Sequence, residues 1–165
     1  MNINYVKVHT NDIFETDAPV LIHGCNCFNT MRKGIAKFIS RKYPKVIESD
    51  NTTPKGSRGK LGTFNCTQVS EELVIVNLYT QYTHWDIEDM FYGDALEDGL
   101  TDILEIFTDM NDFAIPAIGL GLANGVPNEV FDIIHRVANK AKKTIHLHLI
   151  DEHLQKAYNN YVHSY

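Results

Sequence analysis

Short apolar runs alternate along the chain with stretches in which apolar residues recur every three to four positions. The apolar runs predict strands over residues 3–9, 20–24, 61–69, 73–79, 113–116 and 144–150. The longer spacing predicts helices that begin at Gly34 and Pro127, and two more across residues 96–107 and 152–162. Strands that alternate with amphipathic helices indicate an α/β sheet with helices on both faces.

Two prolines mark expected helix boundaries in this pattern. Pro44 is expected to end the helix that begins at Gly34, because proline cannot continue a helix. Residues 49–60 are polar and contain several turn-forming residues, so we expect a mobile loop there. Pro127 suits the first position of the helix after residue 126.

The length and composition of the chain fit one domain. Its 165 residues, 44% of them hydrophobic, suffice for one core, so we assign residues 1–165 to a single domain with 151–165 as its C-terminal helix. The first residues lack the basic and apolar regions of a signal peptide, and no apolar stretch approaches the roughly 18 residues of a membrane span. Three cysteines in such a chain favour a reduced compartment. We therefore expect a cytoplasmic monomer without a membrane partner.

Charge is unevenly distributed along the chain. The formal net charge of -6 argues against a general nucleic-acid-binding protein. Residues 32–60, however, contain nine basic and two acidic residues, which gives this segment +7 and leaves -13 for the rest. The run is either a solvated basic face or a local positive field beside an anion site, and the sequence supports both interpretations equally.

A glycine-rich segment follows the expected strand 113–116. Gly119, Gly121 and Gly125 have the spacing Gly-x-Gly-x-x-x-Gly, which is not the dinucleotide-binding fingerprint. Glycines allow a backbone to approach an oxyanion closely, and the start of the next helix adds a favourable dipole. We therefore favour phosphate binding over a plain strand-to-helix turn.

The stretch from residue 20 to residue 36 combines an apolar strand, a polar turn and a helix start. This arrangement can present backbone N–H groups to a small ligand. His23 lies where the strand enters the turn, so a structural and a catalytic role are both open. Asp94 begins a helix and has N-capping as its default role unless that helix start faces a cleft. The spacing of Cys25, Cys27 and Cys66 disfavours zinc, so we predict no metal site.

Three segments, read together, resemble a macro domain. They are Val20–Cys27, Gly34–Ala36 and Ile115–Ala123, and the resemblance extends in order over about residues 3–150. The likeness is to the ADP-ribose 1''-phosphate phosphatase-like branch, which has phage and bacterial members. The resemblance implies a three-layer α/β/α fold with a mixed sheet of about six strands, ADP-ribose as ligand and no cofactor.

The resemblance also assigns roles to residues. Asp12 matches the acid that binds the adenine amino group, with Ile13 beside it, and Asn26 matches the asparagine that contacts the distal ribose. His23 matches a histidine associated with catalysis, for which Asp94 is a distant candidate partner. The remaining matches form the two ligand-gripping loops: Gly34, Ile35 and Ala36 in the first, and Gly119, Leu120, Gly121, Leu122, Ala123 and the adjoining Asn124 in the second.

The chain departs from the family pattern at two places. Arg32 and Lys33 stand where the first loop is usually rich in glycine, so they either crowd the distal ribose or supply charge to a terminal phosphate. The branch that removes ADP-ribose from acidic side chains or DNA uses a lysine and an aspartate. Here the matching places hold Thr80 or Gln81, and Ala123, so that mechanism is disfavoured.

The leading hypothesis from the sequence is an ADP-ribose-binding phosphatase that hydrolyses ADP-ribose 1''-phosphate to ADP-ribose and phosphate. Two alternatives remain open. One is a non-catalytic reader of ADP-ribose, and the other is a mono-ADP-ribosyl hydrolase that acts on protein or nucleic acid.

Overall fold

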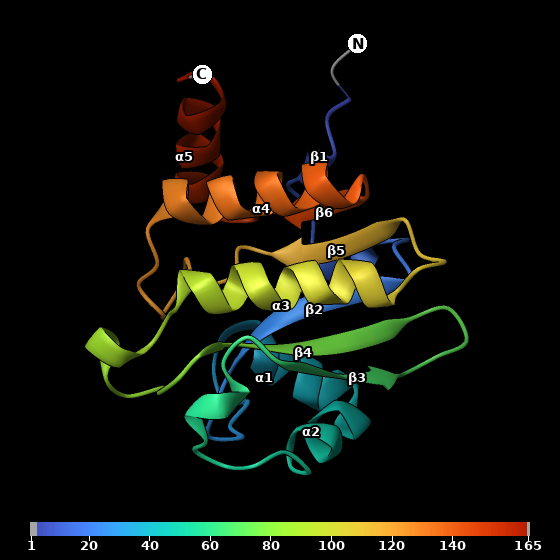
Figure 1. Cartoon of the computed structure of the whole chain (residues 1–165), viewed down its shortest axis with the longest axis vertical. Helices are drawn as coiled ribbons and strands as arrows, with labels where there is room; N and C mark the ends of the chain where they lie inside the picture. Colours follow the sequence, from blue (N-terminus) through green and yellow to red (C-terminus); the bar gives the residue numbers. More distant parts are fainter. Residues whose placement is uncertain (1–2, 165) are drawn as a thin grey trace.

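The sheet of the protein has six strands in the order β1-β6-β5-β2-β4-β3 (Figure 1). The computed structural model describes residues 3–164. The strands are β1 (Val6–His9), β2 (Val20–Asn26), β3 (Phe64–Gln68), β4 (Val74–Gln81), β5 (Asp112–Pro116) and β6 (Thr144–His148). Neighbouring strands pair in parallel except β3, which pairs antiparallel with β4 through a tight hairpin. The expected mixed six-stranded sheet is therefore confirmed.

Helices cover both faces of the sheet. They are α1 (Gly34–Lys42), α2 (Pro44–Asp50), α3 (Gly93–Ile106), α4 (Pro127–Ala141) and α5 (Glu152–Val162). Figure 1 shows α1 and α2 on the side of β2, β4 and β3, with α3 and α4 on the opposite face and α5 beside α4. Across residues 3–164, no helix combines the length and the apolar composition that crossing a membrane requires.

The alternation of side chains along the strands produces two hydrophobic clusters, one on each face. In β2 and β4, Ile22 and Val76 face the cluster that contains residues of α3 and α4. Leu21 and Ile75 face the other cluster, which contains Ile39 of α1 and Val46 of α2. Burial on both faces explains why β2 and β4 are continuous apolar runs.

The helix α2 was not predicted from the sequence. Pro44 was expected only to end the preceding helix, but it also occupies the first position of α2, where its missing N–H costs nothing. The expected loop over 49–60 therefore begins later, and Asp50 is a buried residue of α2.

The remainder of the polar segment forms hydrogen bonds with the loop that follows β2. Lys60 is buried, and its Nζ donates a hydrogen bond of 2.5 Å to Oδ1 of Asn29. The backbone N–H of Gly56 donates to the carbonyl of Cys27 at 2.7 Å. These contacts fasten residues 51–60 to the loop that follows β2.

Candidate functional site

A cleft of about 1500 Å³ opens at the carboxyl ends of the parallel strands, where ligands of open α/β sheets bind. The turn after β2, the start of α1, the end of β4 and the glycine loop after β5 form its sides. The start of α5 closes one end. The residues that line it include Asp12, Ile13, Gly24, Asn26, Arg32, Lys33, Gly34, Ile35, Ala36, Thr80, Gln81, His84, Met90, Gly119, Leu120, Gly121, Leu122, Ala123, His148 and Leu154.

Gly24 forms part of the cleft floor, at a position where a larger residue does not fit. A Cβ atom on Gly24 would lie 2.9 Å from Cγ2 of Ile118 and 2.9 Å from Oγ1 of Thr80. The absence of a side chain brings β2, the end of β4 and the start of the glycine loop into contact.

The glycine loop after β5 forms one wall and exposes backbone donors. Gly119 has a φ of +79°, and a Cβ there would clash with the ring of Phe91. The N–H of Gly125 donates to the carbonyl of Gly119 at 2.6 Å and closes the loop. Within residues 3–164, the N–H groups of residues 121–123 have no hydrogen-bond acceptor. Consecutive free amides of this kind form an anion-binding concavity.

The N-terminus of α1 forms the opposite wall. Lys33 occupies the N-cap position, and its side chain makes no capping hydrogen bond, so the first amides of the helix remain available. Arg32 and Lys33 are exposed, and no carboxylate in the described part of the chain lies within ion-pair distance of either. The wall therefore carries positive charge from both the helix end and the side chains.

Asn26 lines the cleft, but its side chain forms hydrogen bonds within the loop that follows β2. Its Nδ2 donates to the carbonyl and to Oγ1 of Thr30, at 3.1 Å and 2.7 Å. Its Oδ1 accepts from the N–H of Phe28 at 2.8 Å. Both donors of the amide are thus used, so Asn26 shapes the turn after β2 and has no spare N–H for a ligand.

Asp12 and His148 lie at the end of the cleft near α5. Asp12 lines the cleft, and its Oδ1 accepts from the N–H of Phe14 at 2.9 Å. Nδ1 of His148 lies 3.2 Å from the carbonyl of Asn11, and its buried Nε2 has no partner in residues 3–164. Burial lowers the pKa of His148, which disfavours the charged imidazolium.

His23, the candidate catalytic histidine, does not line the cleft. Its side chain is fully buried, and its Nε2 lies 2.6 Å from Oδ1 of Asn77 on the face covered by α2. Burial lowers the pKa of His23 to about 4, and the hydrogen bond to Asn77 opposes this only in part. Its candidate partner Asp94 is exposed in the first turn of α3 and does not line the cleft either.

The ligand-binding candidates are better placed than the catalytic ones. All of them line the cleft except Asn124, which lies just beyond it in a left-handed conformation with a φ of +62°. Sequence reasoning missed His84 and His148, which both line the cleft. His148 could have been proposed from its place at the carboxyl end of the last strand, but no local pattern marks His84.

The thiols offer no metal site. Cys25 and Cys27 are buried, and burial raises the pKa of both, to about 11 for Cys27, while Cys66 is exposed and separate. Across the described residues, no group of three or more histidine, cysteine, aspartate or glutamate side chains is arranged to hold a metal ion.

Sequence comparison finds distant relatives, and no family model matches the chain. An uncharacterized 17.5 kDa protein encoded in the tk-vs intergenic region of phage T4 is 25% identical over 165 residues, 92% of this chain and 97% of the relative. The DNA ADP-ribosyl glycohydrolase of Mycobacterium tuberculosis is 28% identical over 120 residues, or 70% of this chain. The match spans only 33% of that enzyme.

Solved structures share the fold at low sequence identity. The Oceanobacillus iheyensis macrodomain with bound MES has a TM-score of 0.76 at 13% identity, over 99% of this chain and 94% of that one. Thermosipho africanus DarTG in complex with ADP-ribose has a TM-score of 0.73 at 17% identity, over 89% of this chain and 42% of that one.

Proposed function

We propose that this chain, which has the macrodomain fold, binds ADP-ribose in the cleft and hydrolyses a bond at the distal ribose. The observation that carries the proposal is that two sets of free backbone N–H groups line the cleft. The free amides of residues 121–123 lie on one wall, and the uncapped start of α1 lies on the other. A diphosphate between two nucleoside-sized ends suits such a cleft, because both walls attract anions.

The residues at the two ends of the cleft indicate how ADP-ribose is oriented in it. Asp12 offers a carboxylate as hydrogen-bond acceptor, and Ile13 offers an apolar surface, at the end near α5. These groups suit adenine, whose amino group is a donor. We infer that Arg32, Lys33, Gln81 and His84, which also line the cleft, lie toward the distal ribose. Arg41 and Lys42 line the cleft as well, and Lys42 lies over the ring of Phe14 near Asp12, so the direction depends on Asp12 and not on the distribution of basic residues. The reacting bond is therefore assigned to the end away from Asp12.

Hydrolysis at this end is supported by the residues around it. ADP-ribose 1''-phosphate is the simplest substrate, because Arg32 and Lys33 would offset the charge of its terminal phosphate. Water supplies the oxygen that replaces the leaving group, and the leaving oxygen takes up a proton. His84 is better placed than His23 for that proton transfer, because His84 lines the cleft and His23 is enclosed.

The first test is calorimetry with ADP-ribose on the wild type and on Gly121→Glu. A Cβ on Gly121 would meet no atom within 4 Å, so the variant folds while its carboxylate repels the diphosphate. We expect affinity to fall by about tenfold or more. Gly59→Glu is the matched control, because Gly59 is exposed and does not line the cleft. Absence of ADP-ribose binding below millimolar concentration would refute the proposal.

The second test separates the hydrolase from the reader. Phosphate release from ADP-ribose 1''-phosphate is measured beside ADP-ribose release from mono-ADP-ribosylated protein and oligonucleotide. Turnover of any one of them supports the hydrolase, and its loss in His84→Gln but not in His23→Gln supports the role of His84. Tight binding without turnover of any substrate would leave only the reader.

A further inference from the structure

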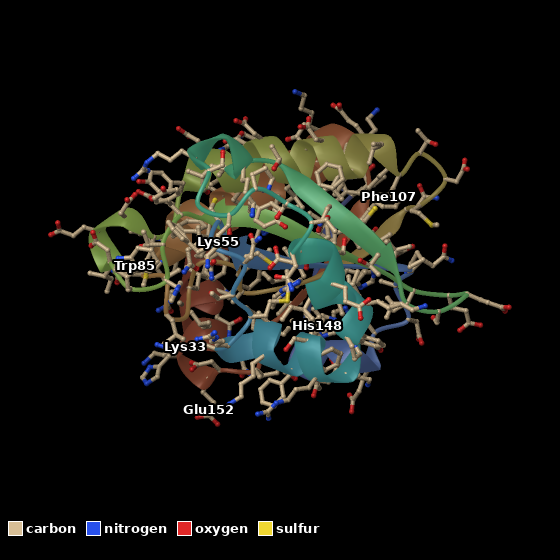
Figure 2. The ribbon with its side chains drawn as sticks, turned by 90° about the horizontal axis from the view of Figure 1, so that it is seen from below. Lys33, Lys55, Trp85, Phe107, His148 and Glu152 are labelled. Carbon is tan, nitrogen blue, oxygen red and sulfur yellow. The ribbon has the colours of Figure 1, made fainter. Side chains whose placement is uncertain are left out.

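The segment between β4 and α3 forms a short arm with an exposed tip. The arm comprises residues 82–91, and its tip, residues 85–88, is exposed throughout. Trp85 and Ile87 of the tip are 61% and 57% exposed, and Figure 2 shows Trp85 at the edge of the molecule. His84, the residue before the tip, lines the cleft. The arm therefore presents two large apolar side chains beside the mouth of the cleft, which indicates a surface for a partner.

Contacts within the protein orient the ring of Trp85. The N–H of Thr83 donates to the carbonyl of Asp89 at 3.0 Å and closes the base of the arm. The ring of Phe28 meets that of Trp85 edge-on, with centroids 4.6 Å apart. The ring of His84 meets it at 90°, with centroids 4.9 Å apart. These contacts fix the indole, yet more than half of the residue stays open to a partner.

The carboxylates beside Trp85 leave the tip with negative charge that is not neutralised. Residues 82–91 contain Asp86, Glu88 and Asp89 and no lysine or arginine. Asp89 pairs with Arg58 at 2.5 Å. Neither Asp86 nor the exposed Glu88 has an ion-pair partner in residues 3–164, although Oδ1 of Asp86 accepts from the N–H of Glu88 at 3.1 Å. The charge of the tip therefore complements a cation.

The base of the same arm already holds a cation between a ring and a carboxylate. The guanidinium carbon of Arg58 lies 3.8 Å from the ring centroid of Tyr82. Nη1 and Nη2 of Arg58 donate to Oδ1 and Oδ2 of Asp89, at 3.1 Å and 2.5 Å. An aromatic face and a carboxylate together bind a guanidinium strongly. Trp85 and Glu88 offer the same two groups at the tip, where this chain supplies no cation.

We propose that Trp85, Asp86 and Glu88 form a subsite for an arginine or lysine side chain of a polypeptide that carries ADP-ribose. This inference rests on the proposed function, since it names the substrate class of the same cleft. That function assigns the distal ribose to the end with His84, so a polypeptide joined to this ribose passes the next residue, Trp85. Arginine suits the subsite better than lysine, because a planar guanidinium stacks on a ring and pairs with a carboxylate.

The same charges disfavour a nucleic acid at the tip. Its phosphates would meet Asp86 and Glu88, and like charges that face each other across an interface weaken binding. Arg32 and Lys33 do line the cleft, but they belong to the α1 wall, and the proposed function assigns them to a terminal phosphate. A polypeptide with a basic residue near its ADP-ribose fits both the charge and the apolar surface of the tip.

The test compares peptides that differ in one side chain. Three short peptides carry ADP-ribose at the same residue through a linkage that is not hydrolysed, and one neighbouring position holds arginine, glutamine or glutamate. Calorimetry with the wild type should give the arginine peptide an affinity about 3- to 30-fold higher than the glutamine peptide, with the glutamate peptide weakest. Trp85 is the only tryptophan of the chain, so a change in its emission with the arginine peptide reports contact at the tip.

Variants connect this preference to the tip. Trp85→Ala and Glu88→Lys should each lower the ratio of the arginine-peptide to the glutamine-peptide affinity, and the double variant should bring it to within about twofold of one. Glu105→Lys is the control, because it makes the same change in net charge at an exposed carboxylate without an ion pair in the described chain. Glu105 is two residues from Phe107, which Figure 2 shows on the side opposite Trp85, so the ratio should persist. Melting temperatures check that each variant is folded.

Three results would overturn the subsite. They are equal wild-type affinities for the arginine and glutamine peptides, a preference for arginine that survives in the double variant, and a larger Trp85-dependent gain with an ADP-ribosylated single-stranded oligonucleotide. Each can occur while free ADP-ribose binds, so failure of the subsite is distinguishable from failure of the proposed function. If free ADP-ribose does not bind to the wild type, the proposed function fails and the subsite fails with it.

Discussion

His23 and Asn77 form a buried pair that links the centre of the sheet to α2. Nε2–H of His23 donates to Oδ1 of Asn77 at 2.6 Å, and Nδ2 of Asn77 donates to the carbonyl of Val46 in α2 at 3.4 Å. Both side chains are completely buried. The pair therefore connects β2, β4 and α2 through polar groups that water cannot reach.

This pair predicts that His23→Ala affects stability more than ligand binding. The substitution leaves Oδ1 of Asn77 without its donor and opens a cavity, so the free energy of unfolding should fall by about 2–4 kcal/mol. Urea unfolding measures the loss, and calorimetry should give an ADP-ribose affinity within about twofold of the wild type. A large loss of affinity in a stably folded variant would contradict the placement of His23 outside the site.

The burial of His23 also predicts that the fold is destabilised by acid. The pKa of His23 is about 4 in the fold against an ordinary 6.5, so between these values the unfolded chain binds a proton that the folded chain excludes. Stability from this group is complete above the ordinary value and is lost as the pH falls toward 4. It should amount to about 2 kcal/mol between about pH 7.5 and about pH 5.

Variants identify the contribution of His23 to the slope of the unfolding free energy against pH. Burial lowers the pKa of His9, His135 and His148 as well, so the wild type should lose more stability in acid than His23 alone explains. His23→Gln should reduce the slope of unfolding free energy against pH, whereas the exposed His153→Gln should leave it unchanged. Equal slopes in wild type and His23→Gln would refute the assignment.

The fold was predictable because its signals are local or periodic. The six apolar runs gave the strands, and the resemblance to a macro domain is confirmed at the level of the fold. The helix α2 escaped prediction because its seven residues are too few for a clear period and begin with Pro44. Its stability comes from the buried Val46, which is a tertiary contact.

The site was predictable only in part, since a strand does not reveal where along its length a cleft begins. The two loops after β2 and β5 follow parallel strands, so their meeting at one edge follows from topology. Within β2, however, Gly24, Cys25 and Asn26 line the cleft, whereas the side chain of His23 is enclosed beside Asn77. The sequence alone does not show that the cleft begins after His23. His84 reaches the cleft through the path of the arm, which no local pattern specifies.

The contacts of Lys60 predict that this residue stabilises the conformation of residues 51–60. Its ammonium is buried, contacts Asn29 and the carbonyl of Cys27, and lies 4.4 Å from the ring centroid of Tyr79. Lys60→Met keeps the side-chain length but removes the ammonium from Oδ1 of Asn29 and from the carbonyl of Cys27, so we expect a loss of about 1–3 kcal/mol in unfolding free energy. Hydrogen exchange of residues 51–60 should accelerate.

Lys55→Met provides the matched comparison within the same segment. Lys55 is exposed, so its replacement should change stability by less than about 0.5 kcal/mol. If both variants unfold at the same urea concentration as the wild type, Lys60 does not anchor the segment.

Arg32 and Lys33 predict a difference between two ligands that share the same cleft. In the proposed function, the additional phosphate of ADP-ribose 1''-phosphate lies near these side chains, whereas ADP-ribose has no such phosphate. Arg32→Ala and Lys33→Ala should therefore each weaken binding of the phosphorylated ligand by about 3- to 10-fold and weaken ADP-ribose less. The difference should shrink as salt is raised, because both side chains are exposed and screened. Lys45→Ala in α2 removes an exposed cation outside the cleft and should alter neither affinity. If instead both variants strengthen ADP-ribose binding, the two side chains crowd the distal ribose and do not serve a terminal phosphate.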